Sequence, residues 1–340
     1  MKVPPLALTL GDPAGIGPEI TAKAWAVLRE SGPRFVVVGD FEAVRAASPS
    51  NAPKVRRVAS AREAADVFPD AVPVLDIPLA VRPVAGKADP AYAGVVIRWI
   101  ETGVGLALSG EAGGVVTAPI AKAPLYAAGF GFPGHTEFLA ELSAGAPQDG
   151  ARGPVMMLTA GGLRTALVTI HEPLSRVPGQ LTLNSVVNVG LVTAQALRRD
   201  FGVEQPRLAM AALNPHAGED GALGREEIEI LRPAARALRD LDIDCEDPRP
   251  ADSLFHAEAR ARYDAVVCAY HDQALIPVKM LDFWGGVNVT LGLPLVRTSP
   301  DHGVGFDIAG RGVARADSLV AAIRLAGEIA ARRRGSGAPA

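Results

Sequence analysis

Six histidines carry the clearest chemical signal in the sequence, because three of them follow short apolar runs typical of buried strands. The three are His171 after residues 165–170, His216 after residues 208–211 and His271 after residues 265–269. Ligands of open α/β sheets bind at the carboxyl ends of the strands, so the three imidazoles are expected at one rim. Three neutral imidazoles hold a divalent metal and leave coordination positions open for a substrate. The wide gaps between them are no local metal signature, so ordinary hydrogen-bonded histidines stay an equal alternative.

A second group of residues suits an anionic substrate. Lys279, Asn288 and Arg297 follow within a short distance of His271, and together they form a plausible clamp for phosphate and carboxylate groups. The alternative for any one of them is a solvated surface residue. Residues His135 and Thr136 open a predicted helix over 137–142, whose first N–H groups would attract an anion.

Three other polar residues are candidates of lower priority. Ser253 is a further possible donor to an anion. His256 lies in a helix-like stretch and is interpreted as structural. His302 follows Pro300-Asp301 at the expected start of a helix, where it is structural or supports the site.

The elements that must position these residues alternate between strands and amphipathic helices. This alternation indicates βαβ units, an α/β fold and a mostly parallel sheet. A hairpin is expected between the strands at 156–158 and 165–170, across Gly161-Gly162. The other expected strands are 6–10, 35–38, 114–117, 208–211, 265–269 and 287–290, and the expected helices are 18–30, 92–109, 184–199, 226–238 and 318–331.

Composition excludes several classes of protein. The 340 residues are 49% hydrophobic and 5% aromatic, which allows two domains and favours helices packed on a sheet. The net charge of −3 gives no basic surface for nucleic acid, and the cluster Arg332–Arg334 suits a helix C-terminus. Two cysteines without a shared motif indicate a reducing compartment. Without an apolar span of about 18 residues or a signal-peptide core, we expect a soluble, cytoplasmic protein with no membrane partner.

One apparent cofactor motif fails its context. Gly129, Gly131 and Gly134 form a G-x-G-x-x-G pattern, but a helix-like segment, 122–128, precedes it where a dinucleotide fingerprint needs a strand. A P-loop motif is also absent from the sequence. Any dinucleotide therefore binds outside a Rossmann loop, at residues that the sequence leaves unknown.

Several longer motifs resemble the 4-hydroxythreonine-4-phosphate dehydrogenase (PdxA) family between about residues 6 and 330. They are G-D-P-A-G-I-G-P-E at 11–19, G-H-T-E-F at 134–138, L-N-P-H-A-G-E at 213–219, P-A-D-S at 250–253, Y-H-D-Q at 270–273, G-V-N-V-T-L-G-L-P at 286–294, R-T-S at 297–299 and D-H-G at 301–303. Their number and order make chance agreement implausible. The chain departs from the usual pattern at Trp284, Gly285 and Val304, which bears on substrate specificity.

The resemblance implies a fold like that of the isocitrate and isopropylmalate dehydrogenases, with two interleaved α/β subdomains in residues 1–330. We expect a subdomain boundary near 145–154 and a disordered tail over 334–340. The resemblance also implies a homodimer whose active sites are built from both subunits. A divalent metal (Zn, Mg or Co) would then be held by His171, His216 and His271 of two subunits.

The implied substrate-binding positions are His135, Thr136, Lys279, Asn288 and Arg297, with Asp252 and Asp272 near the polar end of the substrate. The implied reaction is NAD- or NADP-linked oxidation of 4-phosphohydroxy-L-threonine, followed by loss of CO2, in vitamin B6 synthesis. By position, Asp272 and Lys279 both stay open as the catalytic base. The alternatives are the same chemistry on threonate or erythronate 4-phosphate or on a dihydrodiol carboxylate, a phosphate-binding acyltransferase, and a metal-dependent lyase or aldolase.

Overall fold

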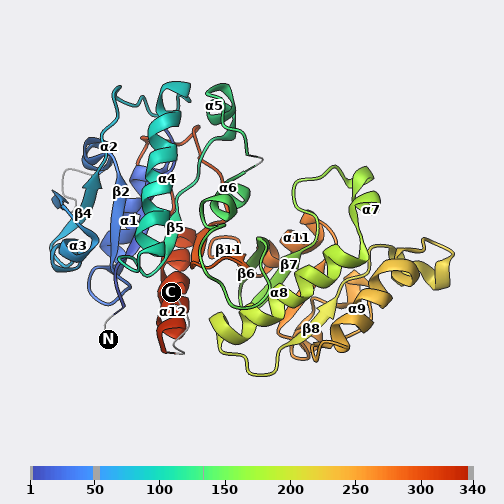
Figure 1. Ribbon diagram of the computed structural model, residues 1–340. Helices are drawn as coiled ribbons and strands as arrows, with labels where there is room; N and C mark the ends of the chain where they lie inside the picture. Colours follow the sequence, from blue (N-terminus) through green and yellow to red (C-terminus); the bar gives the residue numbers. More distant parts are fainter. Residues whose placement is uncertain (1–2, 49–53, 133, 336–340) are drawn as a thin grey trace. The chain divides into compact units, whose positions relative to one another are not determined.

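The structure, a computed structural model, describes residues 3–48, 54–132 and 134–335, and it divides into two compact units. Unit 1 combines residues 1–147 with 293–340, and unit 2 comprises residues 148–292. Both units consist of helices packed on a sheet, so the α/β class predicted from the sequence is confirmed (Figure 1).

Unit 1 is built on six parallel strands in the order β3-β4-β2-β1-β5-β12. The strands are β1 (Leu6–Thr9), β2 (Phe35–Gly39), β3 (Lys54–Arg57), β4 (Ala71–Asp76), β5 (Val115–Thr117) and β12 (Arg297–Pro300). The helices are α1 (Gly17–Leu28), α2 (Phe41–Ala47), α3 (Ala61–Val67), η1 (Pro90–Tyr92), α4 (Ala93–Leu108), α5 (Lys122–Ala127), α6 (His135–Leu142) and α12 (Asp317–Gly335). The strands β1, β2 and β5 are buried throughout, as apolar runs inside a parallel sheet must be.

Helix α4 is the most apolar helix of unit 1. With η1 it forms a span, Pro90–Leu108, that is long and apolar enough to cross a membrane by composition alone. It packs against β1, β2 and β5, and Val96, Trp99 and Ile100 are buried there. We therefore interpret α4 as a core helix, whose hydrophobicity is used in covering the sheet.

Unit 2 is built on the strand order β11-β6-β7-β10-β8-β9. Its strands are β6 (Val155–Ala160), β7 (Leu163–Leu167), β8 (Arg207–Met210), β9 (Asp244–Cys245), β10 (Ala265–Cys268) and β11 (Val287–Leu291). The β6–β7 hairpin across Gly161-Gly162 is antiparallel, as predicted. Strand β11 also pairs antiparallel with β6. Strands β7, β10, β8 and β9 run parallel to one another. The helical segments are η2 (Leu174–Arg176), α7 (Val177–Gln180), α8 (Leu183–Phe201), η3 (Pro215–Gly221), the π-helix η4 (Glu227–Leu231), α9 (Arg232–Arg239), η5 (Ala251–Ser253), α10 (Ala257–Arg260) and α11 (His271–Leu281).

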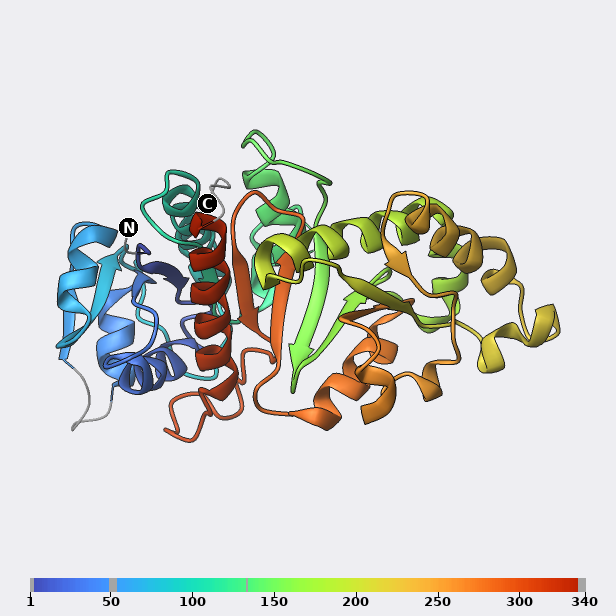
Figure 2. The same cartoon turned by 90° about the horizontal axis from the view of Figure 1, so that it is seen from below.

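Two helices cover the sheet of unit 2, α8 on one side and α11 on the other in Figure 2. Helix α8 begins with a capping box between Thr182 and Ser185 and ends at Gly202, whose φ of 70° suits a left-handed C-cap. Helix α11 inserts Ala274 and Val278 into the core beneath the sheet. Because α11 starts at a predicted metal ligand, its packing also fixes the position of that ligand.

The structure differs from the sequence-based expectations at several points. Strand β7 ends at Leu167, so residues 168–170 are loop, and the helix expected over 226–238 is split into a π-helix and α9. The strand β12 was not predicted, because its residues Arg-Thr-Ser-Pro are buried but polar. His302 does not start a helix, since α12 begins only at Asp317. Of the tail predicted to be disordered, Arg334 and Gly335 belong to α12 and residues 336–340 lie outside the described residues.

Candidate active site

The loops that follow β7, β8 and β10 meet at one edge of the unit 2 sheet. The three strands are parallel, with Cys268 in register with Leu167 and Val267 in register with Met210. All three predicted metal ligands lie in these loops or at the helix that follows: His171 after β7, His216 in η3 after β8, and His271 as the first residue of α11. The carboxyl-end position predicted from the sequence is therefore confirmed for each histidine.

Two of the three histidines lie next to each other, with His171 and His271 ring centroids 5.7 Å apart. Hydrogen bonds beyond the strand ends bring them together. Thr169 donates to the carbonyl of Ala269 from its backbone N–H at 3.2 Å and from its hydroxyl at 2.7 Å. These bonds extend the pairing of the two loops to within two residues of each imidazole.

Asp272 and Gln273 fix the orientation of the His271 loop. The Oδ1 atom of Asp272 lies 2.7 Å from Nδ1 of His271, which leaves Nε2 as the ring nitrogen for a metal. The buried side chain of Gln273 accepts from Ala269 N–H and donates to Ala212 O, both at 2.7 Å. Gln273 therefore links the His271 loop to the end of β8; sequence reasoning missed this residue, although it lies within the Y-H-D-Q motif.

The third histidine, His216, is exposed in η3, at the start of a left-handed turn. Among the described residues, no group of three or more His, Cys, Asp or Glu side chains is arranged to hold a metal ion. One chain thus brings two imidazoles together. A complete set of three ligands would need a further donor, such as His216 of this chain or a residue of another chain.

The remaining unit 2 candidates lie on three different elements. Lys279 is two turns along α11 from His271, and its Nζ lies 5.0 Å from the centroid of the Phe283 ring. Asn288 is the second residue of β11, and its Oδ1 is buried with no hydrogen-bond partner among the described residues. A buried carbonyl oxygen of this kind suits a donor from a ligand. Asp252 is exposed in η5, and neighbouring Ser253 donates to Pro250 O at 2.9 Å rather than presenting its hydroxyl proton to an anion.

In unit 1, Arg297, His135 and Thr136 form a second polar group. Arg297 is 3% exposed, and its Nη2 donates to Oγ1 of Thr117 at 2.8 Å. Burial lowers the pKa of the Arg297 guanidinium to about 10, an effect that the nearby Glu137 carboxylate only partly offsets. A buried guanidinium would interact favourably with a bound anion, because the anion would replace the solvation that burial removes.

The imidazole of His135 stays neutral in this environment. Burial, with Arg297 and Lys122 nearby, lowers the pKa of His135 well below its usual range. Although the residue as a whole is only partly buried, its Nε2 atom is sealed from solvent and has no hydrogen-bond partner among the described residues. The arrangement of one neutral imidazole beside two cations suits an anionic ligand at the start of α6, where Thr136 is also buried.

Sequence reasoning missed Thr117 and Lys122 in this group. Thr117 is the last residue of β5 and bonds Arg297, but a buried threonine at a strand end is too common to be singled out. Lys122 lies close to the N-cap residue of α6, since its Nζ would be 3.3 Å from a Cβ built on Gly134. The helix expected before the G-x-G-x-x-G pattern is confirmed, since α5 ends two residues before Gly129.

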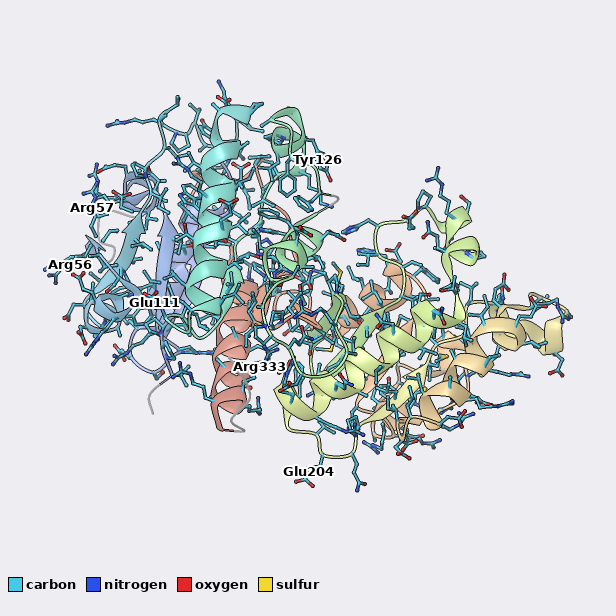
Figure 3. The ribbon with its side chains drawn as sticks, in the orientation of Figure 1. Arg56, Arg57, Glu111, Tyr126, Glu204 and Arg333 are labelled. Carbon is cyan, nitrogen blue, oxygen red and sulfur yellow. The ribbon has the colours of Figure 1, made fainter. Side chains whose placement is uncertain are left out.

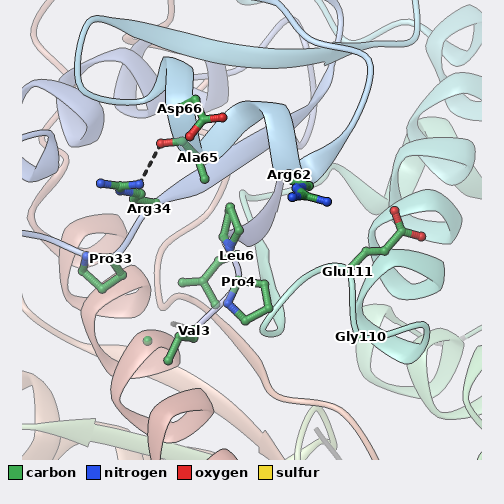
Figure 4. Close-up of a pocket in the computed structure, with 12 residues that line it drawn as sticks. Val3, Pro4, Leu6, Pro33, Arg34, Arg62, Ala65, Asp66, Gly110 and Glu111 are labelled. Carbon is green, nitrogen blue, oxygen red and sulfur yellow. Dashed lines mark hydrogen bonds between the residues drawn. The ribbon is translucent and has the colours of Figure 1, made fainter. Parts of the chain in front are cut away.

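A cavity of about 1000 Å³ lies elsewhere in unit 1, near the amino end of β1 (Figure 4). Arg34, Arg62, Asp66 and Glu111 give it both signs of charge, and Arg34 donates to Ala65 O at 2.8 Å. None of the predicted site residues lines it. Because ligands of open α/β sheets bind at the carboxyl ends of strands, this cavity is not the candidate active site.

Comparisons with known proteins extend over almost the whole chain. The family described as "Pyridoxal phosphate biosynthetic protein PdxA" matches residues 31–326. A relative from Caulobacter vibrioides named 4-hydroxythreonine-4-phosphate dehydrogenase is 68% identical over 329 residues, which are 97% of this chain and 98% of the relative. A solved structure of the dehydrogenase of that name from Klebsiella pneumoniae aligns with a TM-score of 0.83 at 38% identity, covering 96% of this chain and 99% of that one. A terephthalate 1,2-cis-dihydrodiol dehydrogenase from Burkholderia xenovorans aligns with a TM-score of 0.64 at 30% identity, covering 96% and 98%.

Proposed function

Because this chain belongs to the PdxA family of pyridoxal phosphate biosynthetic proteins, we propose that it catalyses the metal-dependent, NAD- or NADP-linked oxidation of 4-phosphohydroxy-L-threonine. The chain is an oxidoreductase of this family, and the substrate, metal and nucleotide are the proposal. The single observation that supports it best is the pair of imidazoles of His171 and His271 at the carboxyl ends of β7 and β10. A cytoplasmic location is part of the same proposal.

The residues present suit a divalent cation such as Zn or Co. Two imidazoles lie side by side, and Asp272 holds the second one through Nδ1, an arrangement common behind metal-binding histidines. His216, from this chain or a second copy, would complete three nitrogen ligands. When bound, the metal would supply Lewis acidity to the substrate hydroxyl and to the ketone formed from it.

Both units carry polar residues that suit an anionic substrate. Arg297, His135 and Thr136 of unit 1 would offer an anion a charged donor, an imidazole and a hydroxyl. Lys279, the amide of Asn288 and exposed Asp252 of unit 2 suit the charged and polar groups of such a substrate. Held at several points, the substrate would keep its reacting carbon fixed for hydride transfer.

We assign proton acceptance to Lys279 rather than Asp272. The Oδ1 of Asp272 is already engaged with Nδ1 of His271, so this carboxylate has a defined role as an orienting group. Lys279 lies two turns further along α11, partly buried beside the Phe283 ring, and its position leaves it as the proton acceptor.

The oxidation releases one proton and transfers one hydride. The C3 hydroxyl proton passes to Lys279, and the hydride from C3 reduces the nicotinamide of NAD+ or NADP+. The product, 2-amino-3-oxo-4-phosphooxybutanoate, has its carboxylate beta to the new ketone. It therefore loses CO2, and the carbon that carried the carboxylate takes up one proton to give 3-amino-2-oxopropyl phosphate.

A homodimer with shared active sites belongs to this proposal, and an exposed apolar surface on and just after α11 supports it. Ile276 and Met280 lie one turn apart on α11 with exposed fractions of 59% and 83%, and Phe283 and Trp284, which follow the helix, are 58% and 49% exposed. The rings of Phe283 and Trp284 pack edge to face with centroids 5.0 Å apart. Apolar surface of this kind usually marks a protein interface, and here it adjoins the helix that starts at His271. No nucleic-acid or membrane partner is proposed.

An initial-rate assay at 340 nm tests the function. Purified protein receives 4-phosphohydroxy-L-threonine with NAD+ or NADP+, with and without EDTA. We expect reduced nicotinamide and CO2 only when metal is present. Activity confined to threonate or erythronate 4-phosphate, or to a dihydrodiol carboxylate as in the Burkholderia relative's name, would show that the substrate is a different one while the mechanism is the one proposed. No nicotinamide reduction with any of them would favour the acyltransferase or lyase alternatives.

A further inference from the structure

The loop after β8 contains a left-handed turn of five successive residues. His216, Ala217, Gly218, Glu219 and Asp220 all have positive φ, between 42° and 81°, and ψ between 0° and 60°. Four of the five carry a Cβ, and such residues adopt this conformation singly and rarely. A run of this length needs strong support from its surroundings, and it places the proposed ligand His216 at its first position.

Glu227 provides that support through Asn214, which lies on the other side of the turn. Glu227 is fully buried, and its Oε1 accepts the backbone N–H of Asn214 at 2.8 Å. Its Oε2 accepts Nδ2 of the same asparagine at 2.9 Å, and Oε2 of Glu226 accepts Nδ2 at 2.7 Å. A buried carboxylate that accepts two bonds from one residue fixes both the position and the orientation of that residue.

Two glycines let the carboxylate and the amide approach the turn. A Cβ on Gly218 would lie 2.7 Å from Oε2 of Glu227 and 2.9 Å from Gly224 O. A Cβ on Gly224 would collide with Nδ2 of Asn214. Glu227 is also the first residue of a π-helical turn, a rare form that occurs often at functional sites. The two glycines leave space for Glu227 and Asn214 beside the left-handed segment, and the π-helical turn begins at Glu227 itself. All of these features adjoin the same left-handed segment.

We propose that Glu227 is a positioning residue, which holds the left-handed turn through Asn214 and so presents His216 to the metal. The inference rests on the proposed role of His216 as a metal ligand. Glu227 itself is buried below the turn and contacts neither the metal nor the substrate. Its effect should therefore appear in the affinity for metal before any substrate is added.

Glu227→Gln tests the proposal with little change of volume. The glutamine can still accept from Asn214 N–H, but it places an amide NH2 against Nδ2 of Asn214, so one acceptor becomes a donor. The affinity of the full-length protein for Co2+ is measured by competition with a chromophoric chelator, and the visible spectrum of bound Co2+ is recorded. We expect binding roughly 10- to 100-fold weaker than that of the wild type, the range for residues that support metal ligands, with an altered Co2+ spectrum.

Glu229→Gln is the matched control. Glu229 lies two residues further along the same π-turn, is exposed, and pairs with Arg225. The charge change is the same, but no contact with Asn214 is lost. Co2+ affinity should equal that of the wild type, and equal weakening in both glutamine variants would overturn the inference, since net charge would then explain the effect.

His216→Ala separates the inference from the proposed function. If His216→Ala binds Co2+ as tightly as the wild type, His216 is not a metal ligand, and the inference about Glu227 is overturned as well. If His216→Ala weakens binding and Glu227→Gln does not, only the inference about Glu227 is overturned. Should Glu227→Gln fail to fold, Asn214→Ser decides, because it keeps the backbone bond to Glu227 and removes the side-chain amide that donates to the carboxylate. Wild-type Co2+ affinity in Asn214→Ser would then refute the proposal.

Discussion

Replacing Arg297 with methionine is expected to stabilise the protein while it impairs substrate binding. Arg297 is 3% exposed, and its Nη2 donates to Oγ1 of Thr117 at 2.8 Å. Burial lowers the pKa of its guanidinium, so the charged form is less favourable here than in water. Methionine has a similar length and no charge, so it can fill the same space without the desolvation penalty.

The pKa of Arg297 gives the magnitude. It falls from 12.5 to about 10, and each pKa unit corresponds to about 1.36 kcal/mol, so the charged form is destabilised by about 3 kcal/mol. Leaving Thr117 without its donor costs about 1 kcal/mol, which leaves a net gain of about 2 kcal/mol. The midpoint of thermal unfolding should rise by roughly 3 °C. Loss of a charged hydrogen bond worth up to about 3 kcal/mol should lower kcat/KM by about 100-fold.

The assay pairs thermal unfolding with initial rates, and Arg333→Met is the control. Arg333, labelled on α12 in Figure 3, is 2% exposed and donates to Pro294 O at 3.3 Å. Its loss leaves a buried carbonyl without that donor, so stability should fall while KM is unchanged. If Arg297→Met is destabilised like Arg333→Met and keeps its KM, Arg297 is a structural residue and the reasoning is refuted.

Three further outcomes are expected. His171→Ala should abolish metal-dependent turnover in the 340 nm assay, and near-wild-type rates after metal removal would contradict the metal role. Because burial holds the pKa of His135 below its unfolded value of about 6.5, the unfolded state binds more protons below that pH. Stability should therefore fall from pH 6.5 toward pH 5, and His135→Asn should reduce the slope of unfolding free energy against pH by up to about 1.4 kcal/mol per pH unit; identical slopes would refute this. Met280→Glu should yield monomers in sedimentation velocity because it buries a charge in the proposed interface, and a persistent dimer would place that interface elsewhere.

Strands and helices with a strong hydrophobic pattern were determined by the sequence itself. The apolar runs of β1, β2 and β10 predict fully buried parallel strands, and the structure has them within one or two residues of the expected ends. Such patterns exist because a residue on a buried face must be apolar unless it is paired. The positions of the three histidines beyond strand ends followed from the same runs.

Elements without that pattern depended on the tertiary structure. Strand β3 lies at the sheet edge with charged, exposed residues, and β12 is polar but buried, so neither shows an apolar run. The hydrogen bonds of β12 come from β5, which is far away in the sequence, and those of β3 come from β4, across the intervening helix α3. Local residue types cannot predict such pairing, because it depends on which strand the fold places alongside.

The candidate site shows the same division. The sequence alone supplied the chemistry of the ligands, but the approach of His171 to His271 depends on Thr169 bonding Ala269, a contact across 100 residues. The left-handed turn at His216 has no local cause, since four of its five residues disfavour it. It forms because the buried carboxylate of Glu227 folds back onto Asn214 and outweighs the local backbone preference.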